Sequence, residues 1–102
     1  MKDRIYFVGI GGIGMSALAR YFRHAGWQVA GYDRTPSPLT DALEREGIPV
    51  HYEDAVERIP EAFRDPACTR VIYTPAVPVD HSELGWFRAN GFEVLKRSQM
   101  LG

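Results

Sequence analysis

The stretch Ile5–Ser16, which reads IYFVGIGGIGMS, decides how the rest of the chain is interpreted. Its apolar start predicts a strand, and the apolar spacing that follows it predicts a helix. Between them lie four glycines within six residues: Gly9, Gly11, Gly12 and Gly14. A strand, a glycine turn and a helix in this order are the context that the G-x-G-x-x-G fingerprint requires. The stretch therefore predicts a site for the phosphates of a nucleotide.

Each glycine of this loop has a predicted role. Gly9 allows a sharp turn, Gly11 allows the backbone to approach a pyrophosphate, and Gly14 allows the helix to pack closely on the sheet. The first N–H groups of the helix have no partners within the helix, and the helix dipole favours a negative charge beside them. Ser16 could add a hydroxyl. We therefore expect an anion site at the start of this helix.

The remaining chain alternates strand and helix patterns, with glycine or proline at the boundaries. Gly26 closes the first helix, Ser37 caps the second and Gly47 ends it, while Asp80 and Glu83 resemble a capping box before the last helix. Strands alternating with helices predict an α/β fold, a Rossmann-like three-layer sandwich with a five-stranded parallel sheet. The expected strands are 5–8, 27–32, 48–52, 70–74 and 92–95, and the later helices are 38–46, 80–90 with its cap and, interrupted by proline, 53–64.

Length and composition fit one soluble domain over residues 1–102, which we expect to be cytoplasmic. The net charge of −1 gives no general reason to bind nucleic acid or an anionic membrane. The lone Cys68 excludes an internal disulfide framework. No leader pattern and no apolar run of the roughly 18 residues that a membrane span needs is evident. His24, His51 and His81 lack the spacing of metal ligands.

Asp33 strengthens the nucleotide interpretation, since it follows Gly14 by nineteen residues at the end of the second predicted strand. An acid at this distance is the expected partner of a ribose hydroxyl. The structural alternative is a glycine-rich turn that only packs a helix on a sheet, with Asp33 capping a loop. The loop leaves open whether the ligand is a dinucleotide or a nucleotide-sugar. Five short strands leave little room for a nicotinamide half, yet a small NAD(P)-binding domain of an oxidoreductase or redox sensor stays an alternative.

The glycine stretch closely resembles the start of the Mur ligases, the ATP-dependent ligases of peptidoglycan precursor biosynthesis. The similarity continues in order through almost the whole chain, at Gly31–Asp33, Tyr73–Pro78 and Lys96–Leu101. The motif Gly-Gly-Ile-Gly-Met-Ser is most similar to that of the family branch that adds L-alanine to UDP-N-acetylmuramate. A sister Mur ligase, or a ligase that recycles murein peptides, stays open.

The resemblance implies a Rossmann-like first domain that binds a UDP-sugar within a three-domain enzyme. The family's glycine loop holds the diphosphate, the acid after the second strand and its neighbours contact the uridine, the loop after the fourth strand lines the uridine pocket, and an arginine near the end approaches the ligand. These roles fall on Gly11, Gly12, Ile13, Gly14, Met15 and Ser16; on Asp33, Arg34 and Thr35; on Thr74, Pro75, Ala76 and Val77; and on Arg97.

The chain departs from the family pattern at several points. Pro75 replaces a serine after the fourth strand, and Glu53-Asp54 stands where a Gly-His pair is common, so no histidine is assigned to the uracil. No P-loop motif is present. By resemblance, ATP and Mg²⁺ bind to a central domain that residues 1–102 do not contain, and L-alanine is joined there as well. We therefore expect an N-terminal substrate-binding domain without catalytic residues or a metal of its own.

Four further residues have ordinary expected roles. His81, beside Asp80 at a helix start, is expected to be solvated, and Cys68 to be an unreactive free thiol. Trp86 and Phe87 are expected to face the core. An exposed apolar patch at Trp86 would instead favour a non-catalytic interaction module.

Overall fold

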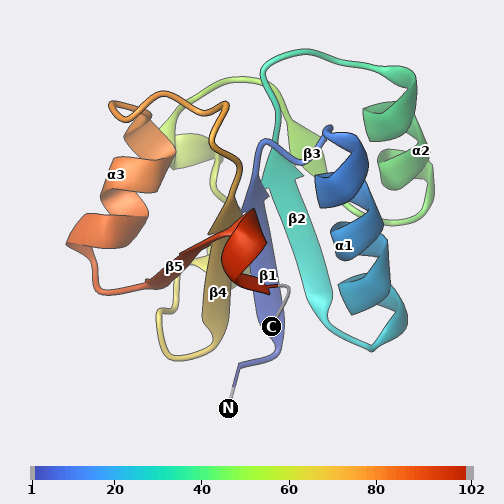
Figure 1. Ribbon diagram of the computed structural model, residues 1–102. Coiled ribbons are helices and arrows are strands. Elements are labelled where there is room, and N and C mark those ends of the chain that lie inside the picture. Colours follow the sequence, from blue (N-terminus) through green and yellow to red (C-terminus); the bar gives the residue numbers. More distant parts are fainter. Residues whose placement is uncertain (1, 101–102) are drawn as a thin grey trace.

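The computed structural model describes residues 2–100 as a parallel sheet between two layers of helices (Figure 1). The strands of the sheet run in the order β3-β2-β1-β4-β5, and all pairs are parallel. The predicted α/β class and the five-stranded parallel sheet are confirmed. In chain order the elements are β1 (Arg4–Val8), α1 (Ile13–His24), β2 (Gln28–Tyr32), α2 (Pro38–Arg45), β3 (Val50–His51), the short 3₁₀ helices η1 (Val56–Arg58) and η2 (Glu61–Phe63), β4 (Thr69–Tyr73), α3 (Ser82–Ala89), β5 (Glu93–Lys96) and the 3₁₀ helix η3 (Arg97–Met100).

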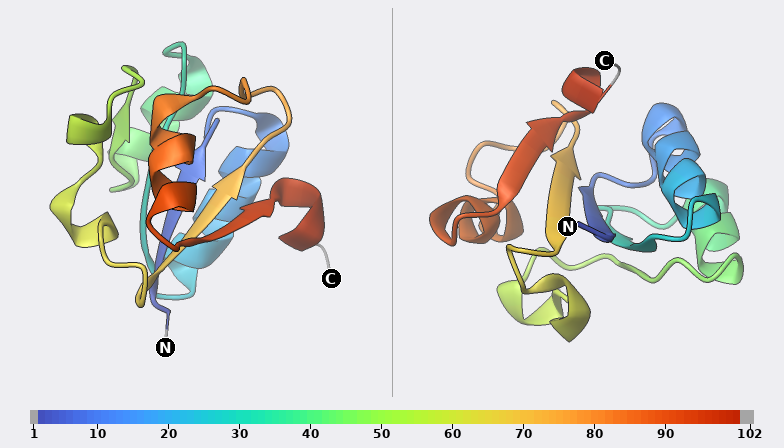
Figure 2. Two further views of the ribbon diagram at one scale, coloured as in Figure 1. Left: turned by 90° about the vertical axis from the view of Figure 1, so that its left-hand side faces the viewer. Right: turned by 90° about the horizontal axis from the view of Figure 1, so that it is seen from below.

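The central strand β1 distributes its side chains to both faces of the sheet, because successive residues of a strand point in opposite directions. Ile5 and Phe7 pack under α1 and α2, whereas Tyr6 and Val8 pack under α3 and the η1–η2 segment. The view from below in Figure 2 shows these two layers on opposite sides of the sheet. All four side chains are fully buried, so the apolar start of the sequence forms the centre of both cores.

The helix boundaries follow the predicted signals where these are local. Gly26, Gly47 and Gly91 all have positive φ, the conformation for which glycine is favoured at helix ends. At the start of α2, the Ser37 side chain accepts from Thr40 N, and the Thr40 side chain accepts from Ser37 N. These predictions of capping residues are confirmed.

Two predicted elements differ from the structure. The segment 53–64 forms no α-helix: η1 and η2 are separate 3₁₀ turns of three residues each, because Pro60 has no N–H to continue a helix and it occupies the N-cap of η2. The third strand is reduced to Val50–His51, at the edge of the sheet.

The start of α3 also differs from the prediction. His81, not Asp80, is the N-cap, and its Nδ1 accepts from Leu84 N at 3.4 Å. The carboxylate of Asp54 accepts from Ser82 N and Glu83 N at 2.9 and 3.0 Å. Glu83 makes no capping box, because its buried carboxylate accepts from the Tyr6 hydroxyl and Ala55 N instead. The helix start is therefore capped partly from a distant loop.

None of the described helices is long and apolar enough to cross a membrane. Phe87 is fully buried, as predicted, and Trp86 is half-buried, with its ring 5.4 Å from that of Phe92.

Candidate functional site

The glycine loop lies at the carboxyl end of β1 and is tied to the end of β2. The N–H groups of Gly9 and Ile10 both donate to the carbonyl oxygen of Tyr32, at 2.8 and 3.0 Å. Gly9 has a φ of +92°, and a Cβ on it would lie 2.3 Å from Thr74 Cγ2. The turn therefore requires glycine at this position, as predicted.

Asp33 connects the glycine loop to the loop after β2. Its carboxylate accepts from Gly11 N at 2.7 Å and from Thr35 N at 3.1 Å. A Cβ on Gly11 would lie 2.6 Å from Asp33 Oδ2, so glycine is needed there for a contact within the protein as well as for any ligand. Each carboxylate oxygen keeps a second acceptor site, which a ribose hydroxyl could use. The loop-capping role and the ligand role of Asp33 are therefore compatible.

The start of α1 has the features of an anion site. Its N-cap, Gly12, provides no side-chain hydrogen bond, and the first turn contains no acidic residue. The N–H groups of the first turn and the helix dipole favour an anion there. Met15 and Ser16 are buried, and the Ser16 hydroxyl donates to Ile13 O at 3.0 Å. An anion at this helix start would thus meet mainly backbone groups.

A cavity of about 320 Å³ opens between the end of β2 and the loop that follows β4. This volume is at the lower end of the roughly 300–1,000 Å³ that is typical of small-molecule sites. Half of the predicted site residues line it, and four other residues complete its wall. The lining residues are Gly9, Gly12, Tyr32, Asp33, Arg34, Thr35, Thr74, Ala76, Val77, Pro78 and His81.

The other predicted site residues lie outside this lining. Pro75 is exposed on the loop after β4, and Met15 and Ser16 are turned into the core. Ile13 is 82% exposed in the first turn of α1. The full set of predicted residues that do not line the cavity is Gly11, Ile13, Gly14, Met15, Ser16, Pro75 and Arg97.

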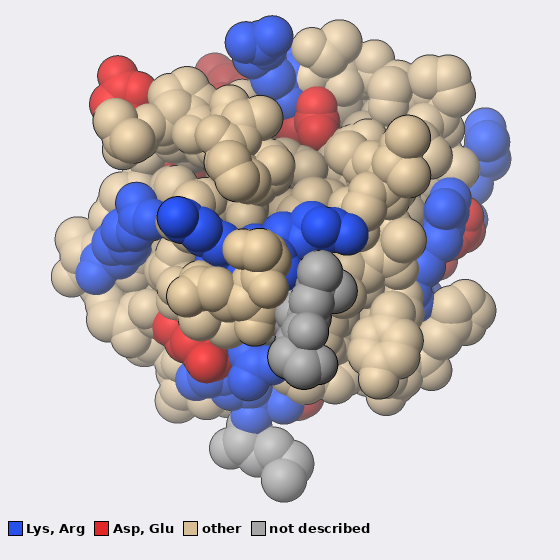
Figure 3. All heavy atoms as spheres, in the orientation of Figure 1, with Lys and Arg blue, Asp and Glu red and all other residues tan. Residues whose placement is uncertain are grey.

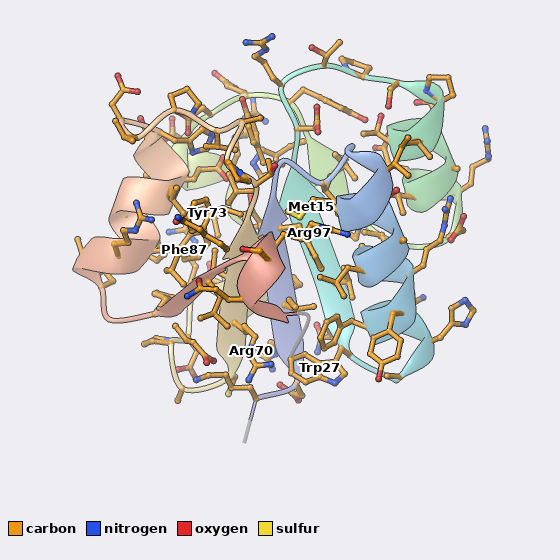
Figure 4. The ribbon with its side chains drawn as sticks, in the orientation of Figure 1. Met15, Trp27, Arg70, Tyr73, Phe87 and Arg97 are labelled. Atoms are coloured by element: carbon orange, nitrogen blue, oxygen red, sulfur yellow. The ribbon has the colours of Figure 1, made fainter. Side chains whose placement is uncertain are left out.

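Arg97 approaches the same helix start from the other side (Figure 4). A Cβ on Gly14 would lie 2.5 Å from the guanidinium group, so Gly14 makes room for Arg97. The three atoms that such a Cβ would approach most closely all belong to this side chain, and the predicted role of Gly14 in packing α1 on the sheet stays a prediction. Arg97 Nε is buried and has no hydrogen-bond partner among residues 2–100. Figure 3 shows basic side chains crossing the middle of this face, where Figure 4 places Arg97.

Four cavity residues were not among the predicted site residues: Gly9, Tyr32, Pro78 and His81. The prediction of a solvated His81 is wrong: its side chain is buried, and its ring packs edge-on against Tyr32 with the centroids 4.7 Å apart. Burial, with the charges of Asp54 and Glu83, raises the pKa of Tyr32, so its hydroxyl stays protonated. The only local signal for His81 was its place before a helix, and that position is usually solvated.

A glycine loop with an acid after the next strand, at the carboxyl end of a parallel sheet, defines a Rossmann-like nucleotide-binding domain. The comparisons with known proteins define the family. Residues 4–102 match the model of the Mur ligase family, catalytic domain, and the chain belongs to this family.

The most similar relatives have consistent descriptions. A UDP-N-acetylmuramate–L-alanine ligase from Porphyromonas gingivalis is 60% identical over 97% of this chain and 22% of its own length. One from Phocaeicola vulgatus is 62% identical over 96% of this chain and 21% of its own. The crystal structure of the UDP-N-acetylmuramate–alanine ligase from Thermotoga maritima superposes with a TM-score of 0.85 at 34% identity, over 96% of this chain and 21% of that chain. This chain therefore spans about a fifth of the length of these relatives.

Proposed function

We propose that residues 1–102 form the UDP-N-acetylmuramate-binding domain of a ligase that uses ATP to join L-alanine to this substrate. The observation that carries the proposal is the identity of about 60% to ligases of that name, over nearly the whole chain. The comparisons give no support to an oxidoreductase. The cavity and the glycine loop supply a compatible site.

Within this proposal the diphosphate lies at the start of α1. The backbone N–H groups after Gly12 and the guanidinium group of Arg97 would face its negative charge. The uridine occupies the cavity, with its ribose beside Asp33, and Arg34, Thr35 and the loop Thr74–Val77 form the surrounding wall.

The proposed role of these residues is positioning. ATP and Mg²⁺ are required by the proposed reaction, but the sequence contains no P-loop, and no group of three or more His, Cys, Asp or Glu side chains suited to a metal occurs among residues 2–100. The described residues therefore do not fit ATP or Mg²⁺, and no chemical step is assigned to them. By fixing the nucleotide, they would present the distant carboxylate of the sugar to the ATP-binding part of a longer protein.

Calorimetric titration of the chain with UDP-N-acetylmuramate, with NAD⁺ and NADPH in parallel, tests this proposal. We expect binding of the UDP-sugar and no heat from either dinucleotide. Binding of a dinucleotide without the UDP-sugar would overturn the proposal in favour of an NAD(P)-binding domain.

Gly12 offers a sharper test of the diphosphate position. A Cβ on Gly12 would meet no protein atom closer than 3.8 Å, so a side chain fits there. Asp at an N-cap favours the helix but would repel a diphosphate. We expect Gly12→Asp to fold at least as stably as the wild type and to bind UDP-N-acetylmuramate about tenfold more weakly or worse. Gly12→Ser, an uncharged N-cap, is the matched control. Equal affinities of the two variants would contradict the assignment.

A further inference from the structure

Two loops that lie far apart in the sequence form the walls of the cavity. The first wall is the loop 33–35 after β2, and the second wall is the loop 74–81, which runs from the end of β4 to the start of α3. The space between them therefore depends on how firmly each loop is held relative to the other.

The short segment 51–55, which begins at the end of β3, is hydrogen-bonded to both sides. On the side of the first wall, the carbonyl oxygen of His51 accepts from Asp33 N at 3.1 Å, which continues the parallel pairing of β2 with β3. On the side of the second wall, the carboxylate of Asp54 accepts from Ser82 N at 2.9 Å. The segment therefore connects the two walls.

Asp54 is the residue of this segment that holds the second wall. Its two carboxylate oxygens accept separately, Oδ2 from Ser82 N at 2.9 Å and Oδ1 from Glu83 N at 3.0 Å. These N–H groups begin α3 and have no acceptor within the helix. His81, which lines the cavity, directly precedes Ser82, and its N–H donates to Pro78 O at 3.1 Å. The position of the Asp54 carboxylate therefore fixes the end of the second wall.

The helix does not depend on Asp54 alone for its cap. His81 Nδ1 already accepts from Leu84 N at 3.4 Å, so α3 has a local cap of its own. The second wall is anchored at its other end by Thr74 N, which donates to Val8 O at 3.3 Å. The additional bonds from Asp54 thus tie a loop that is already capped to a distant part of the chain, as is expected of a contact that sets a distance.

We propose that Asp54 is a positioning residue for the nucleotide: by holding the start of α3 against the segment after β3, it keeps the cavity at the width that a pyrimidine base requires. This inference rests on the proposed function, because it takes the ligand to be a uridine nucleotide whose base lies in this cavity. A site that is fixed before binding has less freedom to lose when the ligand enters. Loosening the second wall should therefore weaken binding of a pyrimidine more than binding of the larger purine.

Calorimetric titrations with UDP and ADP test this role, because the two ligands share the ribose and the diphosphate and differ only in the base. Asp54→Ala removes both acceptors, whereas Asp54→Asn keeps an acceptor oxygen and removes the charge. Glu53→Ala is the matched control, since this neighbouring acid is 63% exposed and pairs with the exposed Arg58.

We expect the wild type to prefer UDP to ADP. In Asp54→Ala we expect UDP to bind about tenfold more weakly, the effect of losing hydrogen bonds to a charged group, while ADP binding falls less, so that the preference for UDP decreases. Asp54→Asn should recover most of the affinity for UDP, and Glu53→Ala should match the wild type with both ligands.

The outcomes separate the two levels of inference. If the wild type binds neither UDP nor UDP-N-acetylmuramate, the proposed function fails and this inference fails with it. If the wild type binds UDP but folded Asp54→Ala keeps its affinity, or loses affinity for UDP and ADP by the same factor, only the role of Asp54 is overturned. Circular dichroism establishes that each variant is folded. Should Asp54→Ala fail to fold, Asp54→Ser, whose side chain is too short to reach both N–H groups, is titrated in its place with the same expected result.

Discussion

The two faces of the sheet are built differently although they share the same central strand. Under α1 and α2, the described residues place only two buried polar groups beside the apolar cluster of Ile5 and Phe7, the hydroxyls of Ser16 and Thr40. Under α3, the side chain of Tyr6 is equally buried, but its hydroxyl donates to Glu83 Oε1 at 2.5 Å. One face is therefore apolar except for two hydroxyls, and the other is organised around a buried carboxylate.

Glu83 is well satisfied despite its complete burial. Besides Tyr6, it contacts His51 Nε2 at 2.7 Å and accepts from Ala55 N at 3.2 Å. Such a network adds little net stability compared with an apolar core, but each member becomes costly to remove. Its partners come from β1, β3 and the loop after β3, so Glu83 fixes where α3 begins. The polar face thus positions His81 at the cavity, whereas the apolar face mainly supplies stability.

The largest expected effect is on the apolar face. Phe7→Ala removes a fully buried ring and leaves a cavity, so we expect the free energy of unfolding to fall by about 4 kcal/mol. Urea unfolding followed by tryptophan fluorescence measures this free energy, since Trp27 borders one face of the sheet and Trp86 borders the other. Val79→Ala, at a side chain that is 94% exposed, should change it little. A loss for Phe7→Ala as small as that of this control would contradict the assigned core.

A somewhat smaller effect is expected from the carboxylate of the polar face. Glu83→Ala leaves the Tyr6 hydroxyl and Ala55 N without their partner, and we expect a loss of about 3 kcal/mol. The exposed Glu57→Ala is the control. We also expect weaker UDP binding in Glu83→Ala, measured by titration, because His81, the N-cap of α3, lines the cavity. Unchanged binding in a destabilised variant would show that the two faces do not differ in the way described.

Tyr6→Phe removes the hydroxyl and keeps the ring. We expect it to lower the free energy of unfolding by about 1–2 kcal/mol near neutral pH. Burial, and next the charge of Glu83, raises the pKa of Tyr6. In the unfolded chain a tyrosine ionises near pH 10, so the stability from this shift is complete below that pH. As the pH rises further, the unfolded chain loses a proton that the folded protein keeps, and stability falls by about 1.4 kcal/mol per pH unit.

Tyr6→Phe has no tyrosine hydroxyl at this position, so it lacks the contribution of the raised pKa. The difference in the free energy of unfolding between the wild type and Tyr6→Phe should therefore become smaller between about pH 9 and 11. Urea unfolding of both proteins across this range provides the measurement. Tyr32 and Tyr52, whose pKa values are also raised, are present in both proteins and cancel in the comparison. A constant difference over the whole range would contradict the assigned shift.

The smallest effect tests a local polar contact on the apolar side. Ser37→Ala removes the side-chain acceptor for Thr40 N at the start of α2, and we expect a loss of about 1 kcal/mol. Ser37→Asp, which retains a capping oxygen, should stay close to the wild type in the same urea measurement. Equal losses in both variants would show that the contact does not stabilise the helix.

The successful sequence predictions depend on short-range rules. The strand and glycine turn of Ile5–Ser16, the cap at Ser37 and the positive φ of Gly26 and Gly47 follow from neighbouring residues alone. The place of Asp33 beside the glycine loop also followed, because adjacent parallel strands bring their carboxyl ends to one edge. The predictions for the segment 53–64 and for the start of α3 failed, because Pro60 and a distant carboxylate override the local pattern.

The sequence by itself determined the class of this domain: a parallel sheet, a glycine loop and an acid suited to a nucleotide. It also determined the resemblance to the Mur ligases, which the comparisons confirm. Only the tertiary structure decided that His81 is buried at the cavity and that Glu83 lies in the core. The physical reason is that burial of a polar side chain depends on partners such as Asp54, Tyr6 and His51, which lie far away in the sequence and meet only when the sheet assembles.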